Sequence, residues 1–198
     1  MKITNFAIIV LVVVIGFLLF RSVKVEDADK KTLGDASQIT ASPSKEGKMP
    51  EIKTGNLTIE KKLLTISTSK GDIEVELYLQ AAPKTVENFL KKAGEGFYNN
   101  KTWHRVEDWV VQGGDPKGDG TGGGDMPTEL NDLTFSLGSI GIARGPDINI
   151  NNDSQFFIVK KDSSFLDKQY TNFGKVTVGM DVVNNISIGD KILNITTK

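Results

Sequence analysis

The 198-residue sequence has no cysteine, one histidine and no excess of either charge. Without cysteine the chain cannot form disulfides, use a thiol nucleophile, or bind zinc or an iron–sulfur cluster through thiolates. The single histidine excludes metal sites built from several imidazoles. Lysine and arginine total 24 against 25 aspartates and glutamates, and this balance gives no support to a nucleic-acid partner.

The motifs of several common enzyme classes are incomplete or missing as well. Gly118–Gly123 fits the pattern G-x-G-x-x-G, but prolines flank it and neither a preceding strand nor a following helix is predicted, which argues against a dinucleotide site. Asp115, Asp119 and Asp125 do not have EF-hand spacing, although a weak surface cation site stays an alternative. No Gly-x-Ser-x-Gly turn accompanies His104, so serine-hydrolase chemistry has no support.

The N-terminal residues 1–25 are expected to form a membrane anchor. Residues 3–20 carry no charge, and a helix of this length measures about 27 Å, close to the roughly 30 Å of bilayer hydrocarbon. A cleaved signal peptide is the alternative, but residues 21–24 offer no small-x-small cleavage site. Basic residues before and after this segment nearly balance, so the positive-inside rule does not decide its orientation. Resemblance to short-tailed signal anchors therefore decides our preference for a single-pass protein whose remaining chain is extracytoplasmic.

Residues 26–54 are expected to be a flexible polar linker. They contain charges of both signs, scattered glycine and proline, and no aromatic residue, so they cannot bury an apolar face. Residues 55–198 differ. Apolar and polar side chains alternate at residues 64–67 and 73–79, which predicts two strands joined by a turn.

Two helices and further short strands complete the predicted domain. A helix should begin at Pro83, because proline lacks only a hydrogen bond that the first turn does not make, and end at Gly94. A second apolar helical stripe spans residues 178–186, and short apolar runs occupy residues 109–111, 140–143 and 156–159. Many short strands with two helices favour a mainly β fold, a closed or nearly closed β-barrel capped by helices.

Several segments together resemble the cyclophilin family of peptidyl-prolyl cis-trans isomerases. They occur in the family's order and extend over about residues 57–198. The resemblance implies a closed eight-stranded antiparallel barrel with two helices, a cofactor-independent isomerase, and proline-containing polypeptides as partners. The segments are Ala82–Phe89, Phe97–Val106, Gln112–Pro116, Gly118–Gly124, Asn152–Ile158, Leu166–Asp167, Phe173–Val176 and Gly179–Val183.

The resemblance also implies the residues of the site. Arg105 would be the catalytic group, because its permanently charged guanidinium can donate to the amide nitrogen of a twisted prolyl bond, and Gln112 would hold it. Phe157 and Leu166 would form the bottom of an apolar pocket; for each residue, packing in the hydrophobic core is the alternative. The expected substrate-binding residues are His104, Trp109, Val110, Ala143, Arg144, Gln155, Phe156, Phe157, Phe165, Leu166 and Tyr170.

Some positions depart from the family pattern. The stretch from Arg105 to Gln112 is one residue shorter than usual and has Glu107–Asp108 in place of a Pro-Gly turn. Arg144 stands where asparagine is common. Phe165 stands where a tryptophan often contacts cyclosporin, which predicts weaker inhibition. We expect a monomeric isomerase that assists folding of exported proteins at the membrane; the alternative is a proline-peptide docking module with little catalysis.

Overall fold

The computed structural model describes residues 61–198. The predicted anchor (residues 1–25), the predicted linker (residues 26–54) and the first residues of the predicted domain lie outside this part. Within residues 61–198, no helix combines the length and the apolar character needed to cross a membrane.

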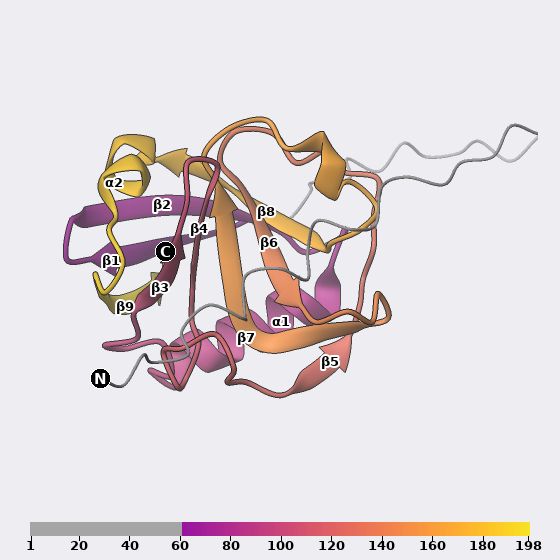
Figure 1. Cartoon of the computed structure of the whole chain (residues 1–198), viewed down its shortest axis with the longest axis horizontal. Helices are drawn as coiled ribbons and strands as arrows, with labels where there is room; N and C mark the ends of the chain where they lie inside the picture. Colours follow the sequence, from indigo (N-terminus) through magenta and orange to yellow (C-terminus); the bar gives the residue numbers. More distant parts are fainter. Residues whose placement is uncertain (1–60) are drawn as a thin grey trace, which may run out of the picture. The chain divides into compact units, whose positions relative to one another are not determined.

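Nine strands form one antiparallel sheet (Figure 1). Eight of them follow the order β3-β4-β7-β6-β8-β2-β1-β9, and β5 pairs with the outer part of β7. The strands are β1 (Lys61–Thr68), β2 (Gly71–Tyr78), β3 (Trp103–Val106), β4 (Val110–Gly113), β5 (Asp125–Pro127), β6 (Ser139–Arg144), β7 (Ile150–Val159), β8 (Asn172–Val178) and β9 (Ile192–Thr197). The mainly β class predicted from the sequence is therefore confirmed.

The predicted closure and strand number are wrong. The two end strands, β3 and β9, form no ladder, so the sheet is an open half-barrel. They approach each other only beside their first residues, where Thr102 and Lys191 make an isolated bridge. The backbone N–H of Trp103 also donates to the carbonyl of Asp190 at 2.9 Å. Three more backbone hydrogen bonds join the same short segments: Gly189 N–H donates to the Trp103 carbonyl at 2.9 Å, and Ile192 N–H to the Lys101 carbonyl and Asn100 N–H to the Ile192 carbonyl at 2.8 Å.

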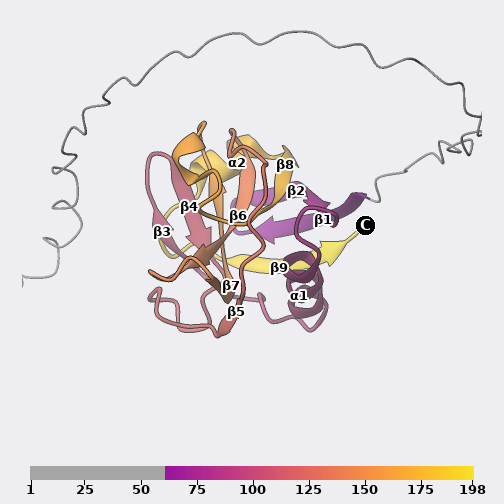
Figure 2. The same ribbon diagram turned by 90° about the vertical axis from the view of Figure 1, so that its right-hand side faces the viewer.

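Two helices lie at opposite sides of the sheet (Figure 2). The helix α1 (Pro83–Gly94) packs against β9 and β7, and it begins and ends where the sequence predicted. The helix α2 (Met180–Asn185) packs against β2 and is shorter than the predicted stripe, because residue 178 still belongs to β8. A short 3-10 helix, η1 (Ser164–Leu166), precedes β8.

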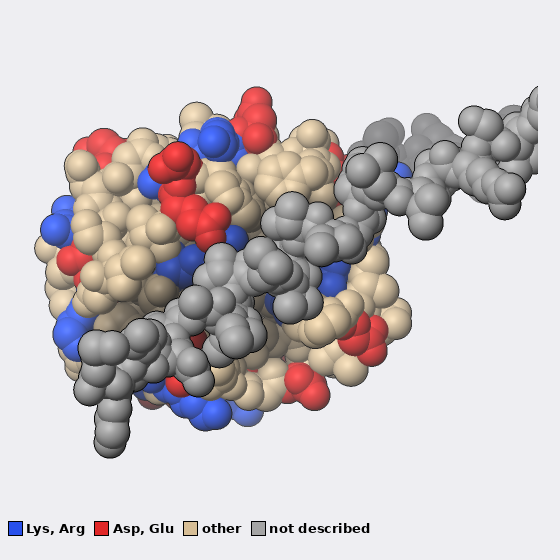
Figure 3. Space-filling model, in the orientation of Figure 1, with Lys and Arg blue, Asp and Glu red and all other residues tan. Residues whose placement is uncertain are grey.

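The inner face of the sheet and α1 enclose the main core. Its centre is aromatic: the Phe89 ring lies 5.0 Å from Tyr98 and 5.2 Å from Phe156, and Trp103 lies 5.5 Å from Phe156 between ring centroids. All four side chains are buried, and burial of one such ring contributes about 1.5–3 kcal/mol. On the face seen in Figure 3, outside the grey atoms, acidic and basic side chains are interspersed among uncharged ones.

Candidate active site

A second apolar cluster lies on the outer face of the sheet, separate from the main core. Side chains of a strand alternate between its two faces. On β7, Phe156 therefore enters the main core and Phe157 enters the outer cluster; on β4, Val111 points inward and Val110 outward. The outer cluster consists of Val110, Phe135, Ala143, Phe157, Val159 and Leu166, with Trp109 and Tyr170 packed against it.

Irregular pairing changes which side chains face outward. The register between β3 and β4 shifts by one residue between Trp103 and Arg105, so His104 is an extra residue on β3. A β-bulge of this kind bends a strand and redirects the next side chain. Trp103 consequently lies in the core, whereas Arg105 reaches the outer face. A similar shift on β6, between Ile142 and Arg144, occurs beside the outer cluster.

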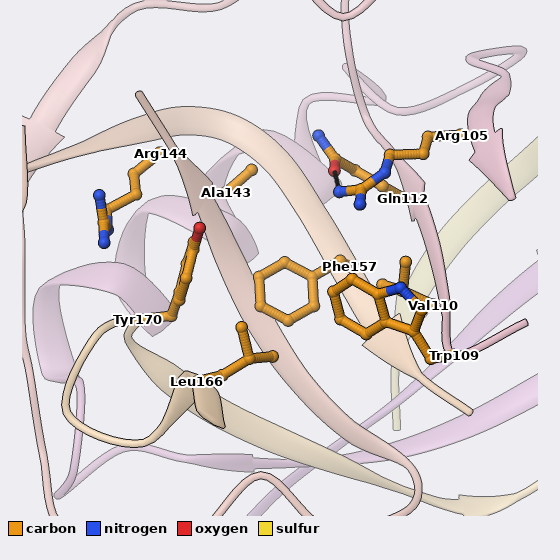
Figure 4. A pocket seen from close by; sticks show the side chains of 9 residues that line it. All are labelled: Arg105, Trp109, Val110, Gln112, Ala143, Arg144, Phe157, Leu166 and Tyr170. Atoms are coloured by element: carbon orange, nitrogen blue, oxygen red, sulfur yellow. Dashed lines mark hydrogen bonds between the residues drawn. The ribbon is translucent and has the colours of Figure 1, made fainter. Parts of the chain in front are cut away.

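The outer cluster is hollowed by a small pocket (Figure 4). Its cavity volume is about 90 Å³. Pockets for drug-sized ligands measure about 300–1,000 Å³, so this one suits a single side chain. Its lining residues are Arg105, Trp109, Val110, Gln112, Ala143, Arg144, Phe157, Leu166 and Tyr170.

Aromatic rings shape the bottom of the pocket. Phe157 lies between Tyr170 on one side and Trp109 on the other (Figure 4). Its ring meets Tyr170 edge to face, with centroids 5.6 Å apart, and stacks on Phe135 at 5.7 Å. Gly141 on β6 makes room for this ring, since a Cβ atom there would overlap Phe157 and approach Phe135 to 2.8 Å. The floor is therefore closely packed and apolar.

One edge of the pocket is polar. Arg105 Nη1 donates to Gln112 Oε1 at 3.3 Å (Figure 4), and Gln112 Nε2 donates to Gln155 Oε1 at 2.9 Å. Gln155 Nε2 donates in turn to the carbonyls of Gly120 and Gly122 at 3.1 and 2.8 Å. This chain of hydrogen bonds connects the guanidinium to the glycine-rich loop and orients both amides.

A residue without a predicted role adds a further contact at this edge. Glu107, in the turn between β3 and β4, accepts hydrogen bonds from Arg105 Nε at 2.7 Å and from Trp109 Nε1 at 2.8 Å. The hydrogen bond from Arg105 lowers the pKa of the Glu107 carboxyl, with a smaller contribution from the Trp109 bond, so the group is charged at neutral pH. In the sequence, the signal was the shortened stretch with Glu107 in place of a proline.

The opposite rim is formed by Arg144 and Tyr170. The Arg144 guanidinium lies over the Tyr170 ring, 4.5 Å from its centroid, and its Nε donates to the carbonyl of Gln169 at 2.8 Å. Phe165 is 65% exposed and meets the Trp109 ring edge to face at 5.2 Å. It therefore lies at the rim beyond Trp109, outside the pocket lining itself.

The structure does not bring every predicted site residue to the pocket. Phe156 belongs to the main core. Gln155 does not line the pocket but accepts a hydrogen bond from Gln112, which does. His104 packs against Gly120 in the glycine-rich loop, where burial lowers its pKa despite the opposing charge of Asp115. Phe165 lies at the rim, and the remaining nine predicted residues line the pocket together. Local pattern alone could not separate Phe156 from Phe157.

The three aspartates that raised the cation alternative do not converge. Within residues 61–198, no group of three or more histidine, aspartate or glutamate side chains is arranged to hold a metal. Asp115 is buried and accepts backbone N–H bonds from Lys117, Asp119 and Gly120 at 3.1, 2.9 and 2.6 Å. Burial alone would raise the pKa of Asp115, but these backbone bonds lower it. The carboxylate therefore acts as an acceptor that holds the glycine-rich loop in place.

Comparisons with known proteins agree on one family. A family model described as cyclophilin type peptidyl-prolyl cis-trans isomerase/CLD matches residues 63–196. Peptidyl-prolyl cis-trans isomerase B of Bacillus subtilis is 47% identical over 124 residues, which cover 60% of this chain and 85% of that protein. Peptidyl-prolyl cis-trans isomerase 9 of Schizosaccharomyces pombe is 36% identical over 149 residues, 70% of this chain but only 23% of that longer protein.

A solved structure has the same fold. The crystal structure of a Cryptosporidium parvum cyclophilin type peptidyl-prolyl cis-trans isomerase superimposes with a TM-score of 0.66 at 28% identity, covering 70% of this chain and 98% of that one. The same protein was also crystallised in the presence of the dipeptide Ala-Pro, with a TM-score of 0.65. By sequence and by fold, the chain belongs to the cyclophilin-type peptidyl-prolyl cis-trans isomerases.

Proposed function

We propose that this chain catalyses rotation about Xaa-Pro peptide bonds, with the proline ring seated on Phe157. The single observation that carries the proposal is the juxtaposition of a one-residue apolar cavity with an arginine at its edge. A proline side chain is apolar and compact, and its amide nitrogen would lie at the cavity mouth. Arg105 and Gln112 would meet the peptide backbone there, while Leu166 and Tyr170 would enclose the ring.

The chemistry that the site must supply is modest in kind. Rotation about an amide has a barrier of about 18–20 kcal/mol, because twisting the bond removes its resonance. The twisted nitrogen regains its lone pair and becomes a hydrogen-bond acceptor, which it is not in the planar amide. A donor placed beside this nitrogen therefore binds the transition state better than either ground state, and such differential binding accelerates the reaction.

Arg105 is suited to this role. A guanidinium carries five N–H donors and keeps its charge at all relevant pH values. Within residues 61–198, one donor bonds Glu107 and one bonds Gln112, which leaves three for substrate. A hydrogen bond to a charged group contributes about 1.5–3 kcal/mol, equivalent to about ten- to a hundredfold in rate. Further acceleration would come from displacing water from the apolar floor.

We also propose that residues 1–25 anchor the chain in a membrane and that residues 26–54 hold the domain away from it. The uncharged run at residues 3–20 supports the anchor, and the polar composition of the linker supports the spacing. With the domain on the extracytoplasmic side, its substrates would be proline-containing segments of exported proteins. Because one chain supplies the whole pocket, a monomer would suffice.

An isomerisation assay on Xaa-Pro peptides with the full chain and its Arg105→Ala variant tests the activity. We expect a fall in kcat/KM of at least tenfold in the variant, with peptide binding largely retained. Equal rates would contradict the mechanism. Tight peptide binding without catalysis by the unaltered chain would instead favour the docking module.

Location needs a separate measurement. Fractionation of cells that produce the chain should place it with membranes, and protease added to intact cells, or to spheroplasts where an outer membrane exists, should remove residues 55–198. A domain protected from protease until the cells are lysed would place it in the cytoplasm and contradict this part of the proposal.

A further inference from the structure

The turn between β3 and β4 places one carboxylate against two side chains of the pocket. Oε1 of Glu107 accepts from Nε of Arg105, and its Oε2 accepts from Nε1 of Trp109. The two donors also contact each other, since the Arg105 guanidinium carbon lies 5.4 Å from the centroid of the Trp109 ring. Each of the three side chains is thus held by the other two.

The backbone of Glu107 is fixed as well. Its N–H donates to the carbonyl of Val110 at 2.8 Å, which closes a tight turn around Asp108 and Trp109. From the end of β7, Lys160 Nζ donates to the Glu107 carbonyl at 3.0 Å, and the Lys160 N–H donates to the Trp109 carbonyl at 2.7 Å. The carboxylate therefore projects from an anchored segment.

We propose that Glu107 is a positioning residue, which holds the Arg105 guanidinium and the Trp109 indole in the arrangement that the pocket requires. The inference rests on the proposed isomerase function. Without Glu107, two long and partly exposed side chains would lose rotamer definition, and restoring it at the transition state costs free energy. The ion pair itself contributes little to stability, because both side chains are more than 40% exposed. Its effect lies in orientation.

The geometry explains why a carboxylate is needed here. A carboxylate offers two acceptor oxygens, one for each donor. A glutamine in its place has the same shape but only one acceptor oxygen, and its NH₂ group would face a second donor. Glu107→Gln should therefore keep one of the two bonds at most. Because Arg105 also bonds Gln112, its position would loosen without being lost.

The experiment compares Glu107→Gln with Asp108→Asn in the full chain. Asp108 is exposed in the same turn, and within residues 61–198 its side chain makes no hydrogen bond, so its replacement removes an equal charge one residue away. Nitrogen–proton NMR spectra report the indole N–H groups directly. The chain has two tryptophans, and the buried Trp103 serves as an internal reference for folding.

We expect Glu107→Gln to shift the Trp109 indole signal, leave that of Trp103 in place, and lower kcat/KM on an Xaa-Pro peptide about three- to tenfold. Asp108→Asn should change neither measurement. An unmoved Trp109 signal, or unaltered kcat/KM in a folded Glu107→Gln chain, would overturn the proposal. If the unaltered chain does not isomerise peptides, the proposed function fails, and the indole signal alone then decides whether Glu107 positions these groups.

Discussion

Trp103 and Arg105 point to opposite faces of β3, although a regular strand would place residues two apart on the same face. The extra residue between them, His104, produces this arrangement by shifting the register against β4. The guanidinium therefore reaches the pocket because of a backbone irregularity, and the indole of Trp103 fills the core for the same reason. One insertion in the ladder serves both the stability of the domain and the geometry of its site.

Replacement of Phe157 by leucine should impair catalysis more than stability. Leucine keeps an apolar floor but loses the flat ring and its contacts with Tyr170 and Phe135. The flat ring would also contact the proline of the substrate, and an aromatic contact contributes about 0.5–1.5 kcal/mol, so we expect kcat/KM to fall about two- to thirteenfold. The matched control is Phe135→Leu, in the same cluster but outside the pocket lining. Equal losses of activity in both variants would contradict a specific role for Phe157.

Replacement of Gly141 by alanine should close part of the pocket from below. The added methyl group would overlap the Phe157 ring and approach Phe135, so the ring must move toward the cavity. Overpacking of this kind costs about 1–3 kcal/mol in the free energy of unfolding, which denaturant titration measures. Peptide affinity should fall in parallel. Gly145→Ala is a suitable control, because a Cβ at that glycine meets no atom within 4 Å; an unchanged Gly141→Ala chain would refute this account of the floor.

His104 should make the stability of the domain depend on pH near neutrality. Burial, helped by the charge of Arg105, lowers the pKa of His104 in the folded chain below its ordinary value of 6.5. The unfolded chain therefore binds a proton more readily, and the free energy of unfolding should fall as pH decreases below about 6.5. Denaturant titrations from pH 7.5 to 5.5 measure this slope. In His104→Gln it should be absent, and a rise in stability on acidification would contradict the prediction.

Phe165 offers a test of inhibitor sensitivity. It is 65% exposed and rests against Trp109 at the pocket rim, where the family often has a tryptophan. Phe165→Trp would restore an indole donor at an exposed position that requires no repacking. We expect tighter inhibition by cyclosporin with unchanged peptide isomerisation, measured as the inhibitor concentration that halves the rate. Unchanged inhibition would show that another rim residue, such as Arg144, limits binding.

Local sequence patterns predicted much of the fold but not its closure. The helix at Pro83–Gly94 follows from apolar spacing and a proline at its start, which are properties of one segment. Barrel closure depends instead on the register between residues near 102 and 191, which no local pattern specifies. The bulge at His104 could not be predicted for a similar reason. It is a shift of one residue in the pairing of β3 with β4, and such a shift exchanges the faces of a strand without a local sequence signal.

The family motif predicted which residues lie near one another, but it did not predict the direction of every side chain. Arg105, Gln112 and Phe157 converge as the family resemblance implied. The same motif also contains Phe156, but the alternation along β7 turns this side chain toward the main core. The sequence alone does not predict a role for Glu107, because it does not show where a turn residue directs its carboxylate.

The alternation along β7 has a consequence for how this domain can change. Consecutive residues belong to different apolar clusters. Phe156 and Ile158 pack in the main core, while Phe157 and Val159 belong to the outer cluster that contains the pocket. The sheet thus separates two sets of side chains that share few contacts, and substitutions on its two sides should have nearly additive effects on the free energy of unfolding. Peptide preference could then be redesigned by substitutions at the outward positions alone, while the side chains of the main core stay unchanged.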